Sequence, residues 1–150
     1  MKKTRLKSKE ANRLLSKYKL DLNKTDQVEF WEDDHQKLLA INKVPAFFYY
    51  GDRPVPTLKY LQAKSLLKKV AIDMGAIKFI VNGADIMRPG IVEIEPEIEK
   101  DEFIAIVDVN HKKPLAVGMA LVGSDEMQKL ASGKVIKNIH YVGDGLWKTE

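Results

Sequence analysis

The sequence predicts an α+β protein with a small N-terminal α+β domain, residues 1–68, and a strand-rich second domain, residues 69–150. Three observations predict this class. Short runs of aromatic and β-branched residues recur between turn residues, as is typical of strands. Helical spacing of apolar residues occurs only in short segments, and these do not alternate regularly with the strands, which excludes a doubly wound sheet. With 150 residues, 45% of them hydrophobic, the chain can bury a core.

The first helix is expected at SKEANRLLSKY, residues 8–18. Ser8 is placed to cap it, and the exposed side is basic. One apolar face follows from the spacing i, i+3, i+4 and i+7 of Ala11, Leu14, Leu15 and Tyr18.

Three short strands are expected next, at residues 27–31, 37–41 and 44–51. The segment GDRPVP that follows ends this pattern, because Pro54 and Pro56 are incompatible with a central strand. A new helical element over residues 57–69 is then indicated by apolar residues at helical spacing. The domain boundary is expected near residues 62–69.

The second domain opens with a strand at residues 70–73 and a helix that Asp73 caps. Gly83 stands where a helix commonly ends in a left-handed residue. Strands are then expected at residues 91–95, 103–109, 114–122 and 138–142. A short helix that begins at Ser124 and ends at Gly133 precedes the last of them.

Positive charge is concentrated in the first half of the chain. Residues 1–75 contain 16 Lys or Arg and 9 Asp or Glu, a net charge of +7, whereas residues 76–150 contain 9 and 12, a net charge of −3. The excess is greatest in residues 1–19, a pattern that attracts polyanions, nucleic acid first. The alternative is a solvated tail and helix face that keep the protein soluble.

The residues do not predict an enzyme, a metal site or a cofactor. There is no cysteine, which excludes a thiolate site and a cysteine nucleophile. His35, His111 and His140 are scattered, and neither a phosphate-binding loop nor a nucleophile elbow is present. No apolar run is long enough for a membrane helix, and the N-terminus lacks the apolar region of a secretion signal. These features predict a cytoplasmic protein without a membrane partner.

The acidic segment EIEPEIEKDE, residues 93–102, contains six carboxylates in ten positions. A cation site is one interpretation, but the segment has no glycine turn of a calcium loop. Ile94 and Ile98 alternate with the acids, so the segment is expected to lie at a solvated sheet edge, where its charges discourage aggregation.

Three motifs in order, GAIKFIVNGADIMRPGI, AVGMAL and NIHYVGDGLW, resemble the PUA domain, an RNA-binding module, over about residues 69–148. Together with PTLKYL, residues 56–61, the chain is similar to the malignant T-cell-amplified sequence family of translation factors and to the corresponding part of ligatin. The resemblance implies a pseudo-barrel of about six strands and two helices. One departure is Lys100-Asp101, where PUA domains commonly have Gly-Asp.

The resemblance also implies an RNA surface between the first helix of the second domain and the strand after it. The residues it assigns are Lys78, Gly83, Ala84, Asp85, Met87, Arg88, Pro89 and Gly90. Bare backbone there would let a nucleotide approach, and Arg88 would add a fork of donors. The alternative is that Gly83 only ends a helix and Pro89-Gly90 only makes a turn.

The implied function is a non-enzymatic RNA-binding factor of translation that contacts the acceptor end of tRNA, small-subunit rRNA or both. Possible partners are the small ribosomal subunit and a translation-factor protein. A second contact with RNA or a partner is assigned to the basic N-terminal residues Lys2, Lys3, Arg5, Lys7, Lys9 and Arg13. The alternative function is an accessory RNA-binding module for a tRNA or rRNA modification enzyme.

Overall fold

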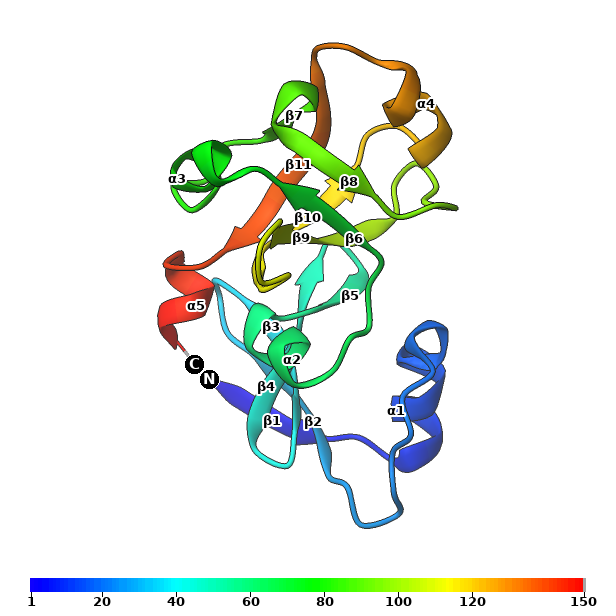
Figure 1. The fold of residues 1–150 in the computed structure, drawn as a ribbon. Helices are drawn as coiled ribbons and strands as arrows, with labels where there is room; N and C mark the ends of the chain where they lie inside the picture. Colours follow the sequence, from blue (N-terminus) through cyan, green and yellow to red (C-terminus); the bar gives the residue numbers. More distant parts are fainter. Residues whose placement is uncertain (150) are drawn as a thin grey trace.

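Two β-sheets lie one above the other in the computed structural model, which describes residues 1–149 (Figure 1). The first sheet is antiparallel in the order β1-β2-β3-β4-β5, and the second has the order β7-β11-β10-β9-β6-β8. The second sheet curls into a barrel-like form, in which β6 pairs with β9 in parallel and the other pairs are antiparallel. The predicted α+β class is confirmed.

The elements of the first half are β1 (Lys2–Arg5), α1 (Ser8–Leu14), the 3₁₀ helix η1 (Ser16–Tyr18), β2 (Val28–Glu32), β3 (Lys37–Ile41), β4 (Val44–Tyr50), β5 (Arg53–Pro56) and α2 (Leu58–Ala63). Those of the second half are β6 (Lys69–Ile72), η2 (Met74–Ala76), α3 (Ile77–Ile80), β7 (Ile86–Met87), η3 (Arg88–Gly90), β8 (Ile91–Ile94), β9 (Phe103–Asp108), β10 (Pro114–Ala120), α4 (Ser124–Lys129), β11 (Lys134–Tyr141) and α5 (Gly145–Thr149).

The two outer strands of the first sheet are elements that the sequence did not predict, and the position of β5 at the sheet edge agrees with the exclusion of a central strand. Residues 2–5 are not a loose tail, because β1 pairs with β2 although all four of its side chains are exposed. The segment around Pro54 and Pro56 is a strand, β5, paired with β4 alone. Proline has no N–H to donate, but at the outer edge of a sheet that donor is not needed.

The first two helices are also shorter than expected. Ser8 does not cap α1: the cap position is Lys7, which makes no side-chain hydrogen bond, and the segment to Tyr18 ends as a 3₁₀ turn. Thr57 caps α2 by accepting a hydrogen bond from the N–H of Tyr60, but the helix ends at Ala63 instead of continuing to residue 69. Leu66 and Leu67 therefore reach the core from the connecting segment rather than from a helix.

In the second half, the Asp73 cap and the left-handed Gly83 are confirmed. Ser124 begins α4 but does not cap it, because its hydroxyl accepts from the N–H of Ile98 in the acidic segment. That segment begins as the edge strand β8, and Ile98 is buried as expected, although it lies in a turn beyond the strand. The last strand begins at residue 134 rather than 138, and a third helix, α5, ends the described chain.

The two sheets share an apolar core. Its members from the first half include Leu38, Phe48, Val55 and Leu58, and those from the second half include Ala71, Phe103, Ala105 and Val117. A separate core fills the curled second sheet, and another lies between the first sheet and α1. Burial of a shared apolar surface fixes the two sheets relative to each other. Within residues 1–149, no helix is both long and apolar enough to cross a membrane.

Candidate nucleic-acid interface

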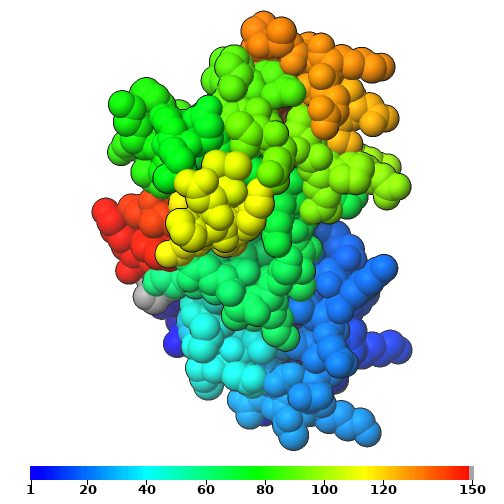
Figure 2. Space-filling model, in the orientation of Figure 1, coloured from blue at the N-terminus to red at the C-terminus, as the bar shows by residue number. Residues whose placement is uncertain are grey.

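An open groove of about 440 Å³ lies where the chain leaves β6, turns through η2 and α3, and returns through β7 and η3. We call it the corner groove. It is lined by Ile72, Asp73, Ala76, Phe79, Ile80, Ala84, Asp85, Ile86, Met87, Pro89 and Gly90. Five of the eight residues assigned to the RNA surface from the sequence are thus brought together there, namely Ala84, Asp85, Met87, Pro89 and Gly90. The segment forms the upper, green part of the molecule in Figure 2.

Asp73 holds the two walls of the groove together. Its carboxylate accepts a hydrogen bond of 2.9 Å from the N–H of Ala76, which starts η2 on one wall. Its own N–H donates to the carbonyl of Gly90 at 3.0 Å on the other wall. A Cβ at Gly90 would lie 3.2 Å from the Cβ of Ala76, so the absence of a side chain at residue 90 permits this close approach.

Gly83 shapes the groove from behind. Its φ of +93° suits glycine, and a Cβ there would lie 3.1 Å from the ring of Tyr141. Its N–H donates to the carbonyl of Ile80, and the N–H of Ala84 donates to the carbonyl of Phe79. These two N–H donors close the end of the helix. Gly83 therefore has a structural role, and its assignment to the RNA surface stays a prediction.

Apolar side chains rather than backbone donors face solvent at the groove. Phe79 is 58% exposed and Met87 is 48% exposed, and both line it. Met74, 53% exposed, lies in η2 just before it. Exposed aromatic and thioether side chains offer flat or adaptable surfaces on which an unstacked base can lie. Sequence reasoning missed Phe79, although an aromatic residue outside the apolar face of a short helix is a signal for it.

Arg88 turns away from the groove and into the protein. Its Nε donates to the carbonyl of Met127 at 2.6 Å, and its Nη1 donates to the carbonyl of Ile91 at 3.2 Å. Its backbone N–H donates to the carbonyl of Gly133. Arg88 thereby ties α4 to the start of β8, so the expectation that its fork lies free for RNA is corrected.

Asp85 and Asn138 brace the floor of the corner. The Asp85 carboxylate accepts from the N–H of Asn138 at 2.9 Å and pairs with Lys134 at 2.9 Å. The hydrogen bond from Lys134 is the main cause that lowers the pKa of Asp85, so this carboxylate is ionised at neutral pH. The amide of Asn138 donates to the carbonyls of Ile80 and Ala84, at 3.0 Å each. The mostly apolar lining of the groove thus contains two carboxylates, Asp73 and Asp85, and that of Asp85 is paired with Lys134.

The cationic residues predicted from the sequence are not gathered at this groove. Lys78 is exposed on α3, where its Nζ lies 5.1 Å from the centre of the Phe79 ring, and it does not line the groove. Of the six N-terminal basic residues, Lys2, Lys3 and Arg5 lie in β1, Lys9 and Arg13 lie in α1, and Lys7 lies between these elements. Figure 1 shows these elements at the opposite end of the molecule from α3 and β7. Any second contact they make is separate from the corner groove.

The two halves of the chain match two family models. Residues 68–142 match the model described as the PUA domain. Residues 2–64 match a model described as a domain of unknown function (DUF1947). Neither description names a catalytic activity.

Relatives along most of the chain include proteins of the translation machinery by name. An uncharacterised protein of Methanocaldococcus jannaschii is 46% identical over 83% of this chain and 77% of its own length. Translation machinery-associated protein 20 of Schizosaccharomyces pombe is 34% identical, over 78% of this chain and 68% of its own. Malignant T-cell-amplified sequence 1 of Danio rerio is 34% identical, over 76% of this chain and 66% of its own.

A solved structure has the same fold along the whole chain. The crystal structure of a hypothetical protein from Pyrococcus horikoshii superposes with a TM-score of 0.88. The two chains are 28% identical, and the match covers 99% of each. The arrangement of both sheets is therefore found in another protein.

Proposed function

The chain belongs to the PUA-domain family and is related to the malignant T-cell-amplified sequence and translation machinery-associated proteins, and from this premise we propose a non-enzymatic RNA-binding role in translation. The bound RNA in this proposal is the acceptor end of tRNA, small-subunit rRNA or both. The resemblance predicted from the three sequence motifs is confirmed at the level of the family.

The corner groove is the observation that carries this proposal. It is apolar along most of its length, it is open, and Phe79 and Met87 are exposed in its lining. Sequence-specific proteins commonly recognise RNA at loops and ends, where unstacked bases lie on aromatic side chains. A groove with these walls suits a base, whereas a phosphate needs donors that this groove does not offer at Gly83, Ala84 or Arg88.

The charges around the groove support the same orientation of the RNA. The Asp85 carboxylate, which is paired with Lys134, offers no donor to a phosphate but can accept from base edges that carry N–H donors. Lys78, exposed beside Phe79, is placed to meet a phosphate outside the groove. In this arrangement the base enters and the sugar-phosphate backbone stays at the rim.

The basic residues of β1 and α1 provide a second, separate contact in the proposal. Lys2, Lys3 and Arg5 are all exposed on β1 at the far end of the molecule. A long RNA such as rRNA, or a protein partner within the translation machinery, can reach both ends at once. The proposal places the protein in the cytoplasm, where it would meet ribosomes.

Ultraviolet crosslinking in cells, followed by sequencing of the RNA and mass spectrometry of the peptide, tests the proposal. The expected RNA is tRNA or small-subunit rRNA, and the expected peptide includes residues 74–90. Recovery of tRNA or rRNA modification enzymes together with the chain, without ribosomes, would instead support the accessory-module function. Crosslinks that avoid residues 74–90 would contradict the role of the corner groove.

A further inference from the structure

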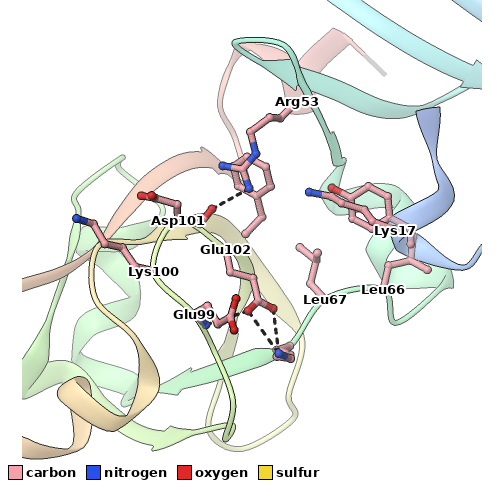
Figure 3. A pocket seen from close by; sticks show the side chains of 11 residues that line it. Lys17, Arg53, Leu66, Leu67, Glu99, Lys100, Asp101 and Glu102 are labelled. Carbon is pink, nitrogen blue, oxygen red and sulfur yellow. Dashed lines mark hydrogen bonds and ion pairs between the residues drawn. The ribbon is translucent and has the colours of Figure 1, made fainter. Parts of the chain in front are cut away.

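A second cleft of about 480 Å³ opens between the two sheets (Figure 3), and it shares no lining residue with the corner groove. Its lining from residues 1–68 includes Lys17, Arg53, Leu67 and Lys68, and its lining from residues 69–149 includes Glu99, Asp101, Glu102 and Phe103. Neither the family descriptions nor the proposed RNA groove assigns a role to this cleft. We call it the inter-sheet cleft.

Two cations of the first half, Lys17 and Arg53, each lie close to one aromatic ring of the second half, that of Phe103. The Arg53 guanidinium carbon lies 3.9 Å from the centre of the Phe103 ring, and the Lys17 amine lies 5.2 Å from the same centre. Phe103 is only 2% exposed, so the ring is a fixed platform. One Nη of Arg53 also donates to the carbonyl of Asp101 at 2.8 Å, which holds the guanidinium in place.

The side chains of Lys17 and Arg53 are not paired with a carboxylate in the described chain, although Glu99, Asp101 and Glu102 line the same cleft. Glu102, the acid that acts on Lys17, is paired with Lys68 at 3.3 Å and accepts the N–H of Glu99. Figure 3 shows the Lys17 amine and the Arg53 guanidinium pointing into the cleft.

Burial and, second to it, the nearby Arg53 lower the pKa of Lys17, and Glu102 opposes them only in part. Two like charges held close together repel each other, and an anion between them relieves that repulsion. A negatively charged group bound in the cleft therefore lowers the free energy of the folded chain.

We propose that the inter-sheet cleft binds a phosphate group between Lys17 and Arg53. Arginine presents a planar fork of donors, whereas lysine is a compact charge with three donors. Two such cations near one ring in a cleft suit a tetrahedral group whose oxygens point in several directions. A planar carboxylate is matched by the arginine fork alone. The shared chemistry is the phosphate oxyanion, whether it belongs to a nucleic-acid backbone or to a small phosphorylated molecule.

The position of the cleft gives the bound phosphate a structural effect. Its cations come from η1 and β5 of the first half, and the Phe103 platform belongs to β9 of the second. A ligand held by these groups adds a link between the two sheets. A ligand that binds only the folded chain raises its free energy of unfolding, and the increase grows with the logarithm of ligand concentration once that exceeds Kd.

Titration of ¹⁵N-labelled full chain with inorganic phosphate, at constant ionic strength, tests the proposal. Amide shifts are expected around Lys17, Arg53 and Phe103, and the melting temperature is expected to rise with phosphate. Lys17→Gln should weaken phosphate binding about ten-fold, the scale of one charge-assisted hydrogen bond. Arg53→Lys, which keeps the charge but loses the fork, should also weaken binding.

Lys24→Gln is the matched control, since Lys24 is exposed and does not line the cleft. It should bind phosphate as the unchanged chain does. Equal affinity in Lys17→Gln and the unchanged chain, shifts confined to residues 2–13, or acetate binding as tightly as phosphate would each overturn the proposal.

An RNA decanucleotide distinguishes the two sources of the phosphate. Shifts at the cleft that Lys17→Gln abolishes would assign the site to a nucleic-acid backbone. Shifts from inorganic phosphate alone would assign it to a small phosphorylated molecule. RNA binding at residues 74–90 is read from separate amides, so failure at the cleft leaves the corner-groove proposal standing.

Discussion

The backbone N–H of Leu58 donates a hydrogen bond of 3.2 Å to Nε2 of His140, which joins the start of α2 to the last strand of the second sheet. Nδ1 of the same ring lies 2.8 Å from the carboxylate of Asp144. Because Nε2 accepts, the ring is neutral and carries its proton on Nδ1, which donates to Asp144. The ring is 1% exposed and packs edge-on against Phe48. A histidine that sequence spacing left without a role thus connects the two halves of the protein.

Stability should fall in mild acid because of His140. Burial is the main cause that lowers the pKa of His140, and Asp144 only partly offsets it. The unfolded chain then takes up a proton near the ordinary pKa of about 6.5, whereas the folded chain does so only at lower pH. The contribution of His140 is therefore complete above about pH 6.5 and is lost as pH falls below it. Urea unfolding between pH 7.5 and 5 should give a decreasing free energy of unfolding.

His140→Gln should flatten this pH dependence, whatever its effect on the stability at pH 7.5. His35→Gln is the control, because His35 is exposed between β2 and β3, where its ring interacts electrostatically with Asp33. An equal acid loss in His140→Gln and His35→Gln would show that another group is responsible.

Phe79→Ala should weaken RNA binding while leaving the fold intact. Loss of one base–aromatic stacking contact costs about 1–3 kcal/mol of binding free energy. Since Phe79 is 58% exposed, the melting temperature should change little. Fluorescence anisotropy with a single-stranded RNA measures the affinity. Val92→Ala removes a comparably exposed apolar side chain outside the groove and should bind as the unchanged chain does.

Ala84→Glu should abolish most RNA binding. Ala84 lines the groove and is exposed, so a longer acidic side chain there obstructs a base and repels phosphate without entering the core. Lys113→Ala, in the turn between β9 and β10, should have no such effect. If Lys113→Ala loses binding while Ala84→Glu retains it, RNA lies on another side of the second sheet.

Arg88→Ala should act mainly on stability. The substitution removes two hydrogen bonds that the charged guanidinium donates to the backbone carbonyls of Met127 and Ile91. Hydrogen bonds to charged groups contribute roughly 1.5–3 kcal/mol each, and partial exposure reduces that, so about 1–3 kcal/mol in total is expected. Urea denaturation measures the loss. If the variant has the stability of the unchanged chain but binds RNA weakly, Arg88 instead contacts RNA directly.

Replacing the basic residues of β1 and its surroundings should reduce the salt dependence of RNA binding. Each phosphate contact by Lys or Arg contributes to the slope of log affinity against log salt. Gln at Lys2, Lys3, Arg5, Lys7 and Lys9 should therefore flatten that slope. Removal of residues 1–9 is a poorer experiment, since it also deletes β1 from the sheet. A salt titration with an unchanged slope would identify these residues as a solvated edge only.

The sequence predicts well where one local rule decides the conformation. Asp73 can cap a helix and Gly83 can end one, and both do. The sequence predicts poorly where contacts with residues far along the chain determine where an element forms or ends. The strand β1 has no apolar alternation and exists because β2 lies beside it, and α2 ends early because Leu66 and Leu67 pack in the core beyond it.

The candidate site was likewise predictable in its location but not in its side-chain contacts. The motif locates the corner, and five assigned residues line one groove. The motif does not predict whether each side chain points into the groove or into the protein, because that depends on neighbours far along the chain. Arg88 meets the carbonyl of Met127, 39 positions later, and Gly83 meets Tyr141. Exposure of Phe79 likewise becomes visible only when the short helix is placed on the sheet.

The outer strands of the first sheet also bear on how separate molecules behave at high concentration. Unpaired strand edges are where chains join one another into fibrils and other aggregates. At one edge, β1 presents three cations in four exposed positions, which repel the same strand of another molecule. At the other, Pro54 and Pro56 remove donors that an added strand would require. Replacing these charges and prolines with valine or threonine would leave a sheet able to grow from molecule to molecule.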